Sequence, residues 1–453
     1  MTALSETKRY QAYPEYKDSG VEWVGNIPSH WQVTPIKYLA TLNPRKSAID
    51  SSLLNKECNF LPMEKLKLNS IVLDEKRLVS DVYDGYTYFE DGDVLMAKVT
   101  PCFENKNIAV ASGLLNGVGF GSSEIYVLRS NEKTDNRFLY YRLQEDSFMD
   151  IATAAMTGAG GLKRVPSEVV NGYSLGTPEV EEQTQIANFL DHETAKIDTL
   201  IEKQQQLIKL LKEKRQAVIS HAVTKGLNPE APMKDSGVEW LGEVPEHWDV
   251  VPLKYLCRFS GGGTPSKDNL SYWTNGTTPW VSPKDMKTFW IEKTQDYVTD
   301  IAVKESSTNL VEKGALLMVV RSGILQRTIP IAINTVPVTL NQDMKALRFN
   351  DRMLAPFAAD FILGNVDKLL LEWSKEGATV ESIEHEYLAN GLFLVPPIAE
   401  QRQIVEALTQ QKERFDELEG KAITGIKLLQ ERRTALISAA VTGKIDVREW
   451  RAH

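Results

Sequence analysis

The chain has 453 residues, of which 42% are hydrophobic and 25% charged, with a net charge of -9. This length exceeds what one hydrophobic core usually serves, and the ordinary composition excludes a wholly disordered chain. No apolar run of about eighteen residues and no apolar N-terminal signal segment occurs, so we expect no membrane span and a cytoplasmic location. The cysteines, Cys58, Cys102 and Cys257, are far apart and predict reduced thiols rather than a zinc site.

The sequence contains a long internal repeat. KDSGVEWVGNIPSHWQVTPIKYL at residues 17–39 returns as KDSGVEWLGEVPEHWDVVPLKYL at 234–256, an offset of 217 residues. RQAVISHAVT at 215–224 returns as RTALISAAVT at 433–442. Ordered matches at a nearly constant offset indicate a tandem duplication, and a period of this length indicates domain-sized modules rather than a solenoid.

The repeats divide the chain into six segments. The predicted segments are an N-terminal tail (1–16), a first module (17–177), a first long helix (178–226), a second module (227–395), a second long helix (396–445) and a C-terminal tail (446–453). In both modules, short strand-like runs such as DVLMAKV (93–99) and GALLMVV (314–320) alternate with Gly, Asn and Pro turns, without regular βαβ order. We therefore predict an α+β fold with two mixed α/β modules. The repeated pairs Trp23/Trp240 and Trp31/Trp248 are expected to anchor the opening segments.

Each module is followed by a long heptad-patterned helix. Pro178 and Pro396 stand at or near the predicted helix starts, and Gly226 and Gly443 stand at the predicted ends. Neither heptad seam is purely apolar, so we expect the two helices to pair within the chain as an antiparallel coiled coil. The predicted seam consists of Leu190, Ile197, Ile208, Leu211 and Val218 in the first helix and Leu408, Phe415, Ile426, Leu429 and Leu436 in the second.

The second helix is expected to be the weaker one. Gly420 and Gly425 each weaken it by about 1 kcal/mol relative to alanine. Glu419 also replaces the seam residue Ile201, so a bent or looser helix pair is expected over part of its length. Acidic and basic residues balance along both helices, which disfavours a basic zipper in the major groove.

Sequence motifs for catalysis are missing. There is no GxxxxGK[ST] phosphate loop, no Asn/Asp-Pro-Pro-aromatic tetrapeptide of an amino-methyltransferase, and no HExxH arrangement among the six histidines. GVGFG at residues 117–121 lacks the helix start and the acidic residue that a dinucleotide site needs. The sequence therefore predicts a binding protein with no catalytic residues and no metal site.

The doubled architecture resembles the specificity subunits of type I restriction–modification enzymes. The resemblance rests on the openers GNIPSHW (25–31) and GEVPEHW (242–248) and on the helix ends R-x-A-[VL]-I-S-x-A-V-T, and it covers nearly the whole chain. FEDGDVLMAKVTPCFENKNIAV (89–110) is similar to one common type of target-recognition domain, and GGTPSKDNLSYW (262–273) is similar to another.

The resemblance implies a mechanism. Each target-recognition domain would read one half of a bipartite, asymmetric site in double-stranded DNA, and the helices would set the spacing. The helices would also dock two methyltransferase subunits carrying S-adenosylmethionine, and motor-nuclease subunits with ATP and Mg²⁺ would join them. The chain itself is expected to bind no cofactor.

Polar, glycine-rich loops supply the candidate DNA contacts. Lysine, arginine, serine, threonine and glutamine offer donors for phosphates and base edges. Arg321 and Gln342 are the foremost candidates for direct base reading, since arginine favours guanine and glutamine favours adenine. The candidates are Lys98, Thr100, Lys106, Ser122, Ser123 and Lys163 in the first module and Thr264, Ser266, Lys284, Lys287, Arg321, Ser322 and Gln342 in the second.

Three alternatives stay open from the sequence. One is a specificity subunit of a type II-like methylase–nuclease, which only the partner proteins would distinguish. Another is a coiled-coil adaptor that binds proteins, which the net charge of -9 would suit. An enzyme is the third, and the missing motifs oppose it.

Overall fold

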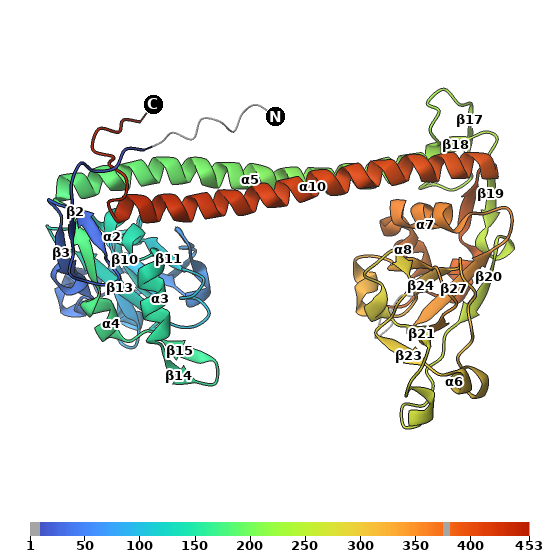
Figure 1. Ribbon diagram of the computed structural model, residues 1–453, viewed down its shortest axis with the longest axis horizontal. Helices are drawn as coiled ribbons and strands as arrows, with labels where there is room; N and C mark the ends of the chain where they lie inside the picture. Colours follow the sequence, from blue (N-terminus) through green and yellow to red (C-terminus); the bar gives the residue numbers. More distant parts are fainter. Residues whose placement is uncertain (1–9, 375–380, 453) are drawn as a thin grey trace. The chain divides into compact units, whose positions relative to one another are not determined.

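The computed structural model describes residues 10–374 and 381–452. These residues belong to two compact units, Met1–Gln204 with Thr424–His453, and Gln205–Ile423, and each is described by itself. Two long helices, α5 (Val180–Lys225) and α10 (Ile398–Val441), each contribute one half to each unit (Figure 1). Each unit therefore combines one globular module with two helix halves, one of which comes from the distant copy of the repeat.

The first module contains two four-stranded sheets. The sheet in the order β11-β10-β13-β4 is antiparallel throughout, whereas β5 and β12 run parallel in the sheet β8-β5-β12-β9. The strands of these sheets are β4 (Ala40–Leu42), β5 (Glu57–Leu61), β8 (Glu75–Leu78), β9 (Thr87–Glu90), β10 (Val94–Ala97), β11 (Ile108–Val110), β12 (Val118–Gly121) and β13 (Ile125–Ser130). Two-stranded pairs join β1 (Tyr16–Asp18) with β2 (Asn26–Pro28), β3 (Gln32–Pro35) with β16 (Ser174–Thr177), β6 (Leu66–Lys67) with β7 (Ser70–Ile71), and β14 (Thr157–Ala159) with β15 (Leu162–Arg164). The short helices are α1 (Val79–Val82), α2 (Asn136–Arg142), α3 (Asp146–Ala154) and α4 (Ser167–Gly172).

The second module repeats this plan with different lengths. It has a five-stranded sheet in the order β20-β27-β24-β25-β22 and a three-stranded sheet in the order β23-β21-β26. Its strands are β17 (Met233–Asp235), β18 (Glu243–Pro245), β19 (Asp249–Pro252), β20 (Cys257–Gly261), β21 (Thr278–Val281), β22 (Trp290–Ile291), β23 (Asp296–Val298), β24 (Leu316–Val319), β25 (Ile331–Asn334), β26 (Thr339–Leu340), β27 (Met344–Phe349) and β28 (Leu392–Val395). Its short helices are α6 (Asp300–Glu305), α7 (Ala355–Gly364), α8 (Val366–Trp373) and α9 (His385–Asn390).

The repeat is visible in the strand pairing. In the first module, β3 of the opening segment pairs antiparallel with β16, the strand that leads into α5. In the second, β19 pairs in the same way with β28, which leads into α10. The predicted α+β fold of two related modules, each followed by a long helix, is confirmed.

The long helices run antiparallel to each other inside each unit. In the second unit, Lys212 lies 3.1 Å from Glu419, and Arg215 pairs with Asp416, so residue numbers rise along one helix as they fall along the other. In the first unit, Arg433 Nε lies 3.0 Å from Asp198 Oδ1. The predicted antiparallel pairing is therefore confirmed.

The expected weak stretch of the second helix keeps its helical conformation. α10 is helical through both Gly420 and Gly425. Glu419, the acidic residue at a seam position, is half-buried and neutralised by Lys212 of α5. An ion pair thus replaces the apolar contact that the seam pattern requires at this position. The ten predicted seam residues are all buried or half-buried; Leu190, Ile197, Leu408 and Phe415 are buried, and Ile208, Leu211, Val218, Ile426, Leu429 and Leu436 are half-buried.

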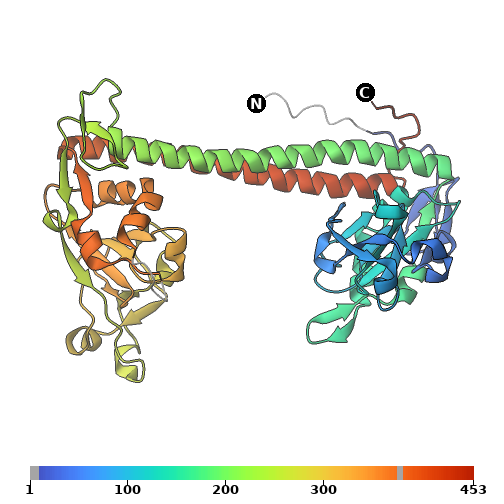
Figure 2. The same ribbon diagram turned by 180° about the vertical axis from the view of Figure 1, so that it is seen from behind.

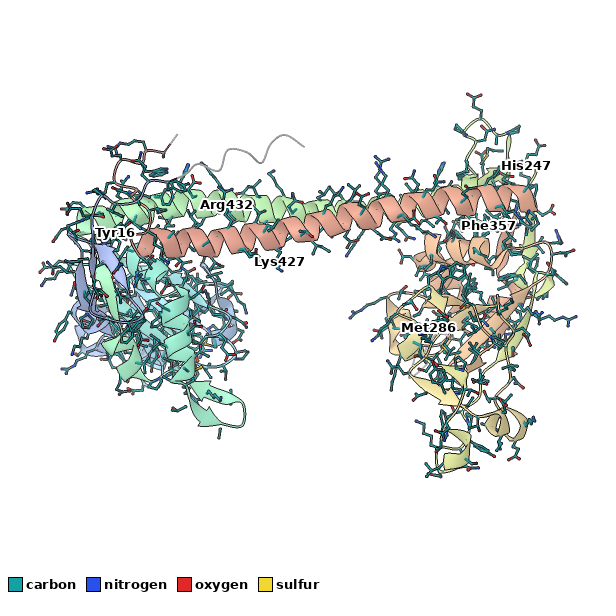
Figure 3. All side chains as sticks on the ribbon, viewed as in Figure 1. Tyr16, His247, Met286, Phe357, Lys427 and Arg432 are labelled. Carbon is teal, nitrogen blue, oxygen red and sulfur yellow. The ribbon has the colours of Figure 1, made fainter. Side chains whose placement is uncertain are left out.

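Each long helix ends against a repeated tryptophan. Gly443, with φ +72°, follows α10, and a Cβ there would lie 2.5 Å from Pro28 Cδ and 3.2 Å from Trp31 Cη2. The hydroxyl of Tyr16 donates to the Gly443 carbonyl, 2.9 Å away (Figure 3). Gly226, with φ +76°, follows α5 and packs in the same way on Trp248. Both tryptophans are fully buried, as the expected anchoring role requires. The other predicted anchors are less buried: Trp240 is half-buried, and Trp23 is exposed with its Nε1 donating to the Ser174 carbonyl at 3.1 Å.

The segments predicted as terminal tails pack on the first unit. Residues 1–9 and 453 lie outside the described residues, but Tyr13 is buried, and its hydroxyl donates to Glu182, 2.7 Å away. At the other end, Val447 is buried, and the ring of Trp450 contacts that of Phe189 edge-on. Aromatic and apolar side chains therefore hold residues 10–16 and 446–450 on the first unit.

A buried glutamine fastens the start of each long helix. Gln401 is fully buried; its Oε1 accepts from Leu354 N at 2.8 Å, and its Nε2 donates to the carbonyls of Arg352 and Pro396, each 2.8 Å away. Gln183 repeats this at α5, accepting from Asp135 N and donating to the carbonyls of Lys133 and Pro178. Sequence reasoning missed this pair of residues.

Gln401→Leu is expected to lower the free energy of unfolding by about 2 kcal/mol or more, because it leaves a buried N–H and two carbonyls without partners. Urea unfolding followed by circular dichroism measures this loss. Gln403→Leu, at an exposed position of the same helix, is the control. Equal losses in the two variants would contradict the assigned role.

Candidate nucleic-acid interface

Three segments of the first module meet in what we name the first loop cluster, residues 98–100, 122–125 and 157–164. Lys98 N donates to the Glu124 carbonyl at 3.0 Å, and Thr100 N donates to the Lys163 carbonyl at 3.0 Å. These backbone bonds bring together five of the six residues predicted in this module, which are Lys98, Thr100, Ser122, Ser123 and Lys163. The hairpin β14–β15 projects from the end of this module that lies away from α5 (Figures 1 and 2).

Glycines shape the hairpin of the first loop cluster. Gly160 and Gly161, with φ of +64° and +82°, form the turn between β14 and β15. Positive φ at both central residues is the geometry of a type I′ turn, which matches the twist of the flanking strands. The Thr100 hydroxyl donates to the Gly161 carbonyl at 2.7 Å and accepts from Lys163 N at 3.0 Å. The turn is thereby tied to the end of β10, with the Lys163 side chain exposed.

An ion pair that sequence reasoning missed lies in the same cluster. Arg164 donates through Nε and Nη2 to the two carboxylate oxygens of Glu124, at 2.9 and 2.8 Å. These hydrogen bonds, more than any other contact, hold the pKa of Glu124 below its ordinary value. The Lys98 ammonium lies 5.1 Å from the ring centre of Tyr126, within reach of a cation–π interaction.

Lys106 is not part of this cluster. Its ammonium lies 2.9 Å from Asp146 and 2.8 Å from the Gln144 carbonyl, at the start of α3. These contacts tie the 101–107 turn to the body of the module. Lys106 therefore has a structural partner, unlike the exposed Lys163.

The second loop cluster consists of residues 261–264, 320–323, 341–344 and 381–383. Gly263 N donates to the Leu340 carbonyl at 2.8 Å, and the Thr264 hydroxyl donates to Gln342 Oε1. Arg321 Nε lies 3.0 Å from Asp343 Oδ1, an ion-pair distance without hydrogen-bond alignment. The structure thus brings together four predicted residues, Thr264, Arg321, Ser322 and Gln342.

The other predicted residues of this module lie on adjoining loops. The Ser266 carbonyl accepts from Trp273 Nε1 at 3.0 Å, which fixes the 261–273 loop on an aromatic side chain. Lys284 and Lys287 are exposed in the turn after β21, and that strand meets the second loop cluster where Asn341 N donates to the Val281 carbonyl at 2.9 Å.

The described part of the chain contains neither a candidate metal site nor a candidate membrane span. No group of three or more His, Cys, Asp or Glu side chains there is arranged to hold a metal ion. No helix in residues 10–374 or 381–452 is long and apolar enough to cross a membrane.

Both copies of the repeat match one known family. The family model of the type I restriction modification DNA specificity domain matches residues 28–210 and 245–428. The specificity subunits of the Escherichia coli type I enzymes EcoR124I/EcoR124II and EcoAI are 37% and 32% identical over 195 and 214 residues. These alignments cover 43% and 45% of this chain but only 44% and 36% of those subunits. The putative MjaX specificity subunit of Methanocaldococcus jannaschii is 23% identical over 94% of this chain and 96% of its own length.

Solved structures share the fold. A chain from a study of complex assembly and conformational transition of the type I R-M system has a TM-score of 0.75 at 16% identity, covering 92% of this chain and 99% of its own. The HsdS subunit of Thermoanaerobacter tengcongensis has a TM-score of 0.57 at 17% identity, with coverages of 92% and 98%. At such identities the likeness concerns the fold alone. The two matches to the family model, which together span most of the sequence, show that this chain belongs to the type I restriction–modification DNA specificity family, with two copies of its domain.

Proposed function

We propose that this chain reads double-stranded DNA for a type I restriction–modification complex and itself catalyses no reaction. The observation that carries the proposal is the pair of loop clusters, each rich in donors and each built on the same place in a duplicated module. Because their side chains differ, the two half-sites read by them differ in sequence. The site is therefore bipartite and asymmetric.

The partners follow from the same proposal. Two methyltransferase subunits, which carry S-adenosylmethionine, dock on the paired helices, and motor-nuclease subunits bring ATP and Mg²⁺, all in the cytoplasm. The helices fix the distance between the half-sites, since half-site spacing on DNA is a geometric property of the reader. The relatives are named as subunits of type I restriction enzymes, which supports this assembly.

Deleting the gene is expected to abolish N6-methyladenine at one interrupted, asymmetric motif in the host genome. Single-molecule methylome maps with and without the gene measure this, and the motif gives both half-sites together. Complementation with the wild-type gene is the control. An unchanged methylome would contradict the proposal if the wild-type chain, reconstituted with its modification subunits, also failed to bind duplex DNA with a salt-dependent affinity.

A further inference from the structure

The two loop clusters share one backbone frame. Three hydrogen bonds of the first cluster recur in the second at matching places. They are Lys98 N to Glu124 O (3.0 Å), Val165 N to Lys98 O (2.9 Å) and Thr100 N to Lys163 O (3.0 Å), against Val320 N to Asp343 O (2.8 Å), Ile383 N to Val320 O (2.8 Å) and Ser322 N to Glu381 O (3.1 Å). Through this frame, Glu124 corresponds to Asp343, Val99 to Arg321, and Arg164 to Ser382.

An arginine–carboxylate pair occupies this frame in both modules, yet the arginine comes from different strands. Arg164 belongs to the hairpin strand β15, whereas Arg321 follows β24. The β-bridges Val99–Arg164 and Arg321–Ser382 show that the two positions are cross-strand neighbours. An arginine at either position can therefore reach the same carboxylate. The pairing recurs although the residue that supplies the arginine does not.

The pairing leaves the guanidinium free to read a base. Glu124 accepts from Nε and Nη2 of Arg164, which uses two of the five N–H groups of the side chain. The end of the guanidinium that points away keeps N–H groups on both Nη atoms. Two such parallel donors fit O6 and N7 of guanine in the major groove. Both arginine side chains are accessible for this, with 47% of Arg164 and 61% of Arg321 exposed.

The presence of Glu124 and Asp343 in the loop clusters has a physical explanation. An unpaired acidic side chain in a DNA-facing loop would repel the phosphates, so its cost must be offset by a second role. A carboxylate that fixes the guanidinium plane lowers the side-chain entropy lost when the base is bound. This role explains why an acidic residue stands at the same position of both loop clusters.

We propose that Arg164 and Arg321 each read a guanine, one in each half-site, and that Glu124, through two hydrogen bonds, and Asp343, through an ion pair, are positioning residues for the two guanidinium groups. This inference rests on the proposed function. It adds Arg164 and both carboxylates to the residues that the loop chemistry singled out.

The test uses full-length variants assembled with the modification subunits and a DNA library with randomised half-sites, read out by adenine methylation. Arg164→Ala is expected to relax one G·C position of one half-site by roughly 5- to 150-fold and to leave the other half-site unchanged. Arg164→Lys should relax the same position, because it keeps the charge but loses the two parallel donors. Glu124→Gln should weaken the preference at that position only.

Arg321→Ala and Asp343→Asn should act in the same way on the other half-site. Arg352→Ala is the matched control, because Arg352 is 46% exposed and pairs with Asp249 at 2.9 Å, outside both clusters. An unchanged motif in both Arg164 variants, or an equal loss on all sequences, would overturn the proposal, since equal loss marks a phosphate contact. If the wild-type complex selects no motif at all, the proposed function fails instead.

Discussion

Lys412→Met is expected to lower the free energy of unfolding by about 3–5 kcal/mol at neutral pH, because it strands a buried carboxylate. Lys412 of α10 is paired with Asp360 of α7, whose side chain is only 3% exposed. The pair borders a cavity of about 710 Å³ in the second unit. In the same unit, Phe357 of α7 (Figure 3) and Leu408 of α10 belong to one buried core cluster, so α7 cannot move away from α10 without opening that core.

The effect of this substitution should depend on pH. Burial raises the pKa of Asp360 above its ordinary value of 3.8, and Lys412 opposes that rise. Removing the lysine raises the folded-state pKa of Asp360 further. Between the unfolded and the folded pKa the native state binds more protons, so stability falls as pH rises through this window. The deficit of Lys412→Met should therefore be smaller at pH 5 than at pH 7.

Urea unfolding at both pH values measures this prediction. The double variant Asp360→Asn/Lys412→Met, which has no charge left to bury, should recover most of the loss. Lys427→Met, at an exposed position of the same helix, is the control (Figure 3). A deficit that is the same at both pH values and is not recovered by the double variant would show that the lysine acts through packing alone.

Trp31→Ala is expected to cost about 3–5 kcal/mol, the usual range for removing a fully buried tryptophan. Trp31 contacts the end of α10 and donates through Nε1 to Glu182 Oε1 at 3.0 Å. Its loss would leave a cavity at the point where the helix meets the opening segment. Thermal and urea unfolding of the variant measure the loss.

The second copy supplies a control for the hydrogen bond. Trp248 is equally buried, but its Nε1 has no hydrogen-bond partner among the described residues. Trp31→Phe removes one of the two hydrogen bonds that Glu182 Oε1 accepts, whereas Trp248→Phe removes a donor that is already unsatisfied. Trp31→Phe should therefore cost more than Trp248→Phe by about 1 kcal/mol or more. Equal costs would show that the Glu182 contact adds nothing to stability.

The fold was predictable because the sequence contains two similar copies that can be compared with each other. Two stretches that match at an offset of 217 residues must pack alike, so the repeated Trp31 and Trp248 marked the anchors before any contact was known. The long helices were predictable from heptad spacing and terminal glycines, because both are local signals. Chain ends carry no such signal, and the packing of Tyr13 and Val447 on the first unit depends on contacts between distant residues.

The contacts of the loop residues could not be predicted from the local sequence. Loop chemistry singled out Lys106 and Lys163 alike, but only the fold shows that Lys163 lies beside Thr100 and that Lys106 forms an ion pair with Asp146. Arg164 and Glu124 are 40 residues apart in the sequence, so no spacing rule joins them. The buried Gln183 was missed because a glutamine in the first turn of a helix is normally solvated.

The ends of the two long helices make equivalent contacts, although the contacting residues are close in sequence in one case and far apart in the other. The end of α5 reaches Trp248 through the chain that follows it directly, whereas the end of α10 reaches Trp31 at the opposite terminus of the sequence. Both contacts use a glycine in the left-handed region and the same proline–tryptophan surface. Each opening segment therefore packs on the end of the long helix that belongs to the other copy of the repeat. Neither contact depends on the order of the two copies in the sequence.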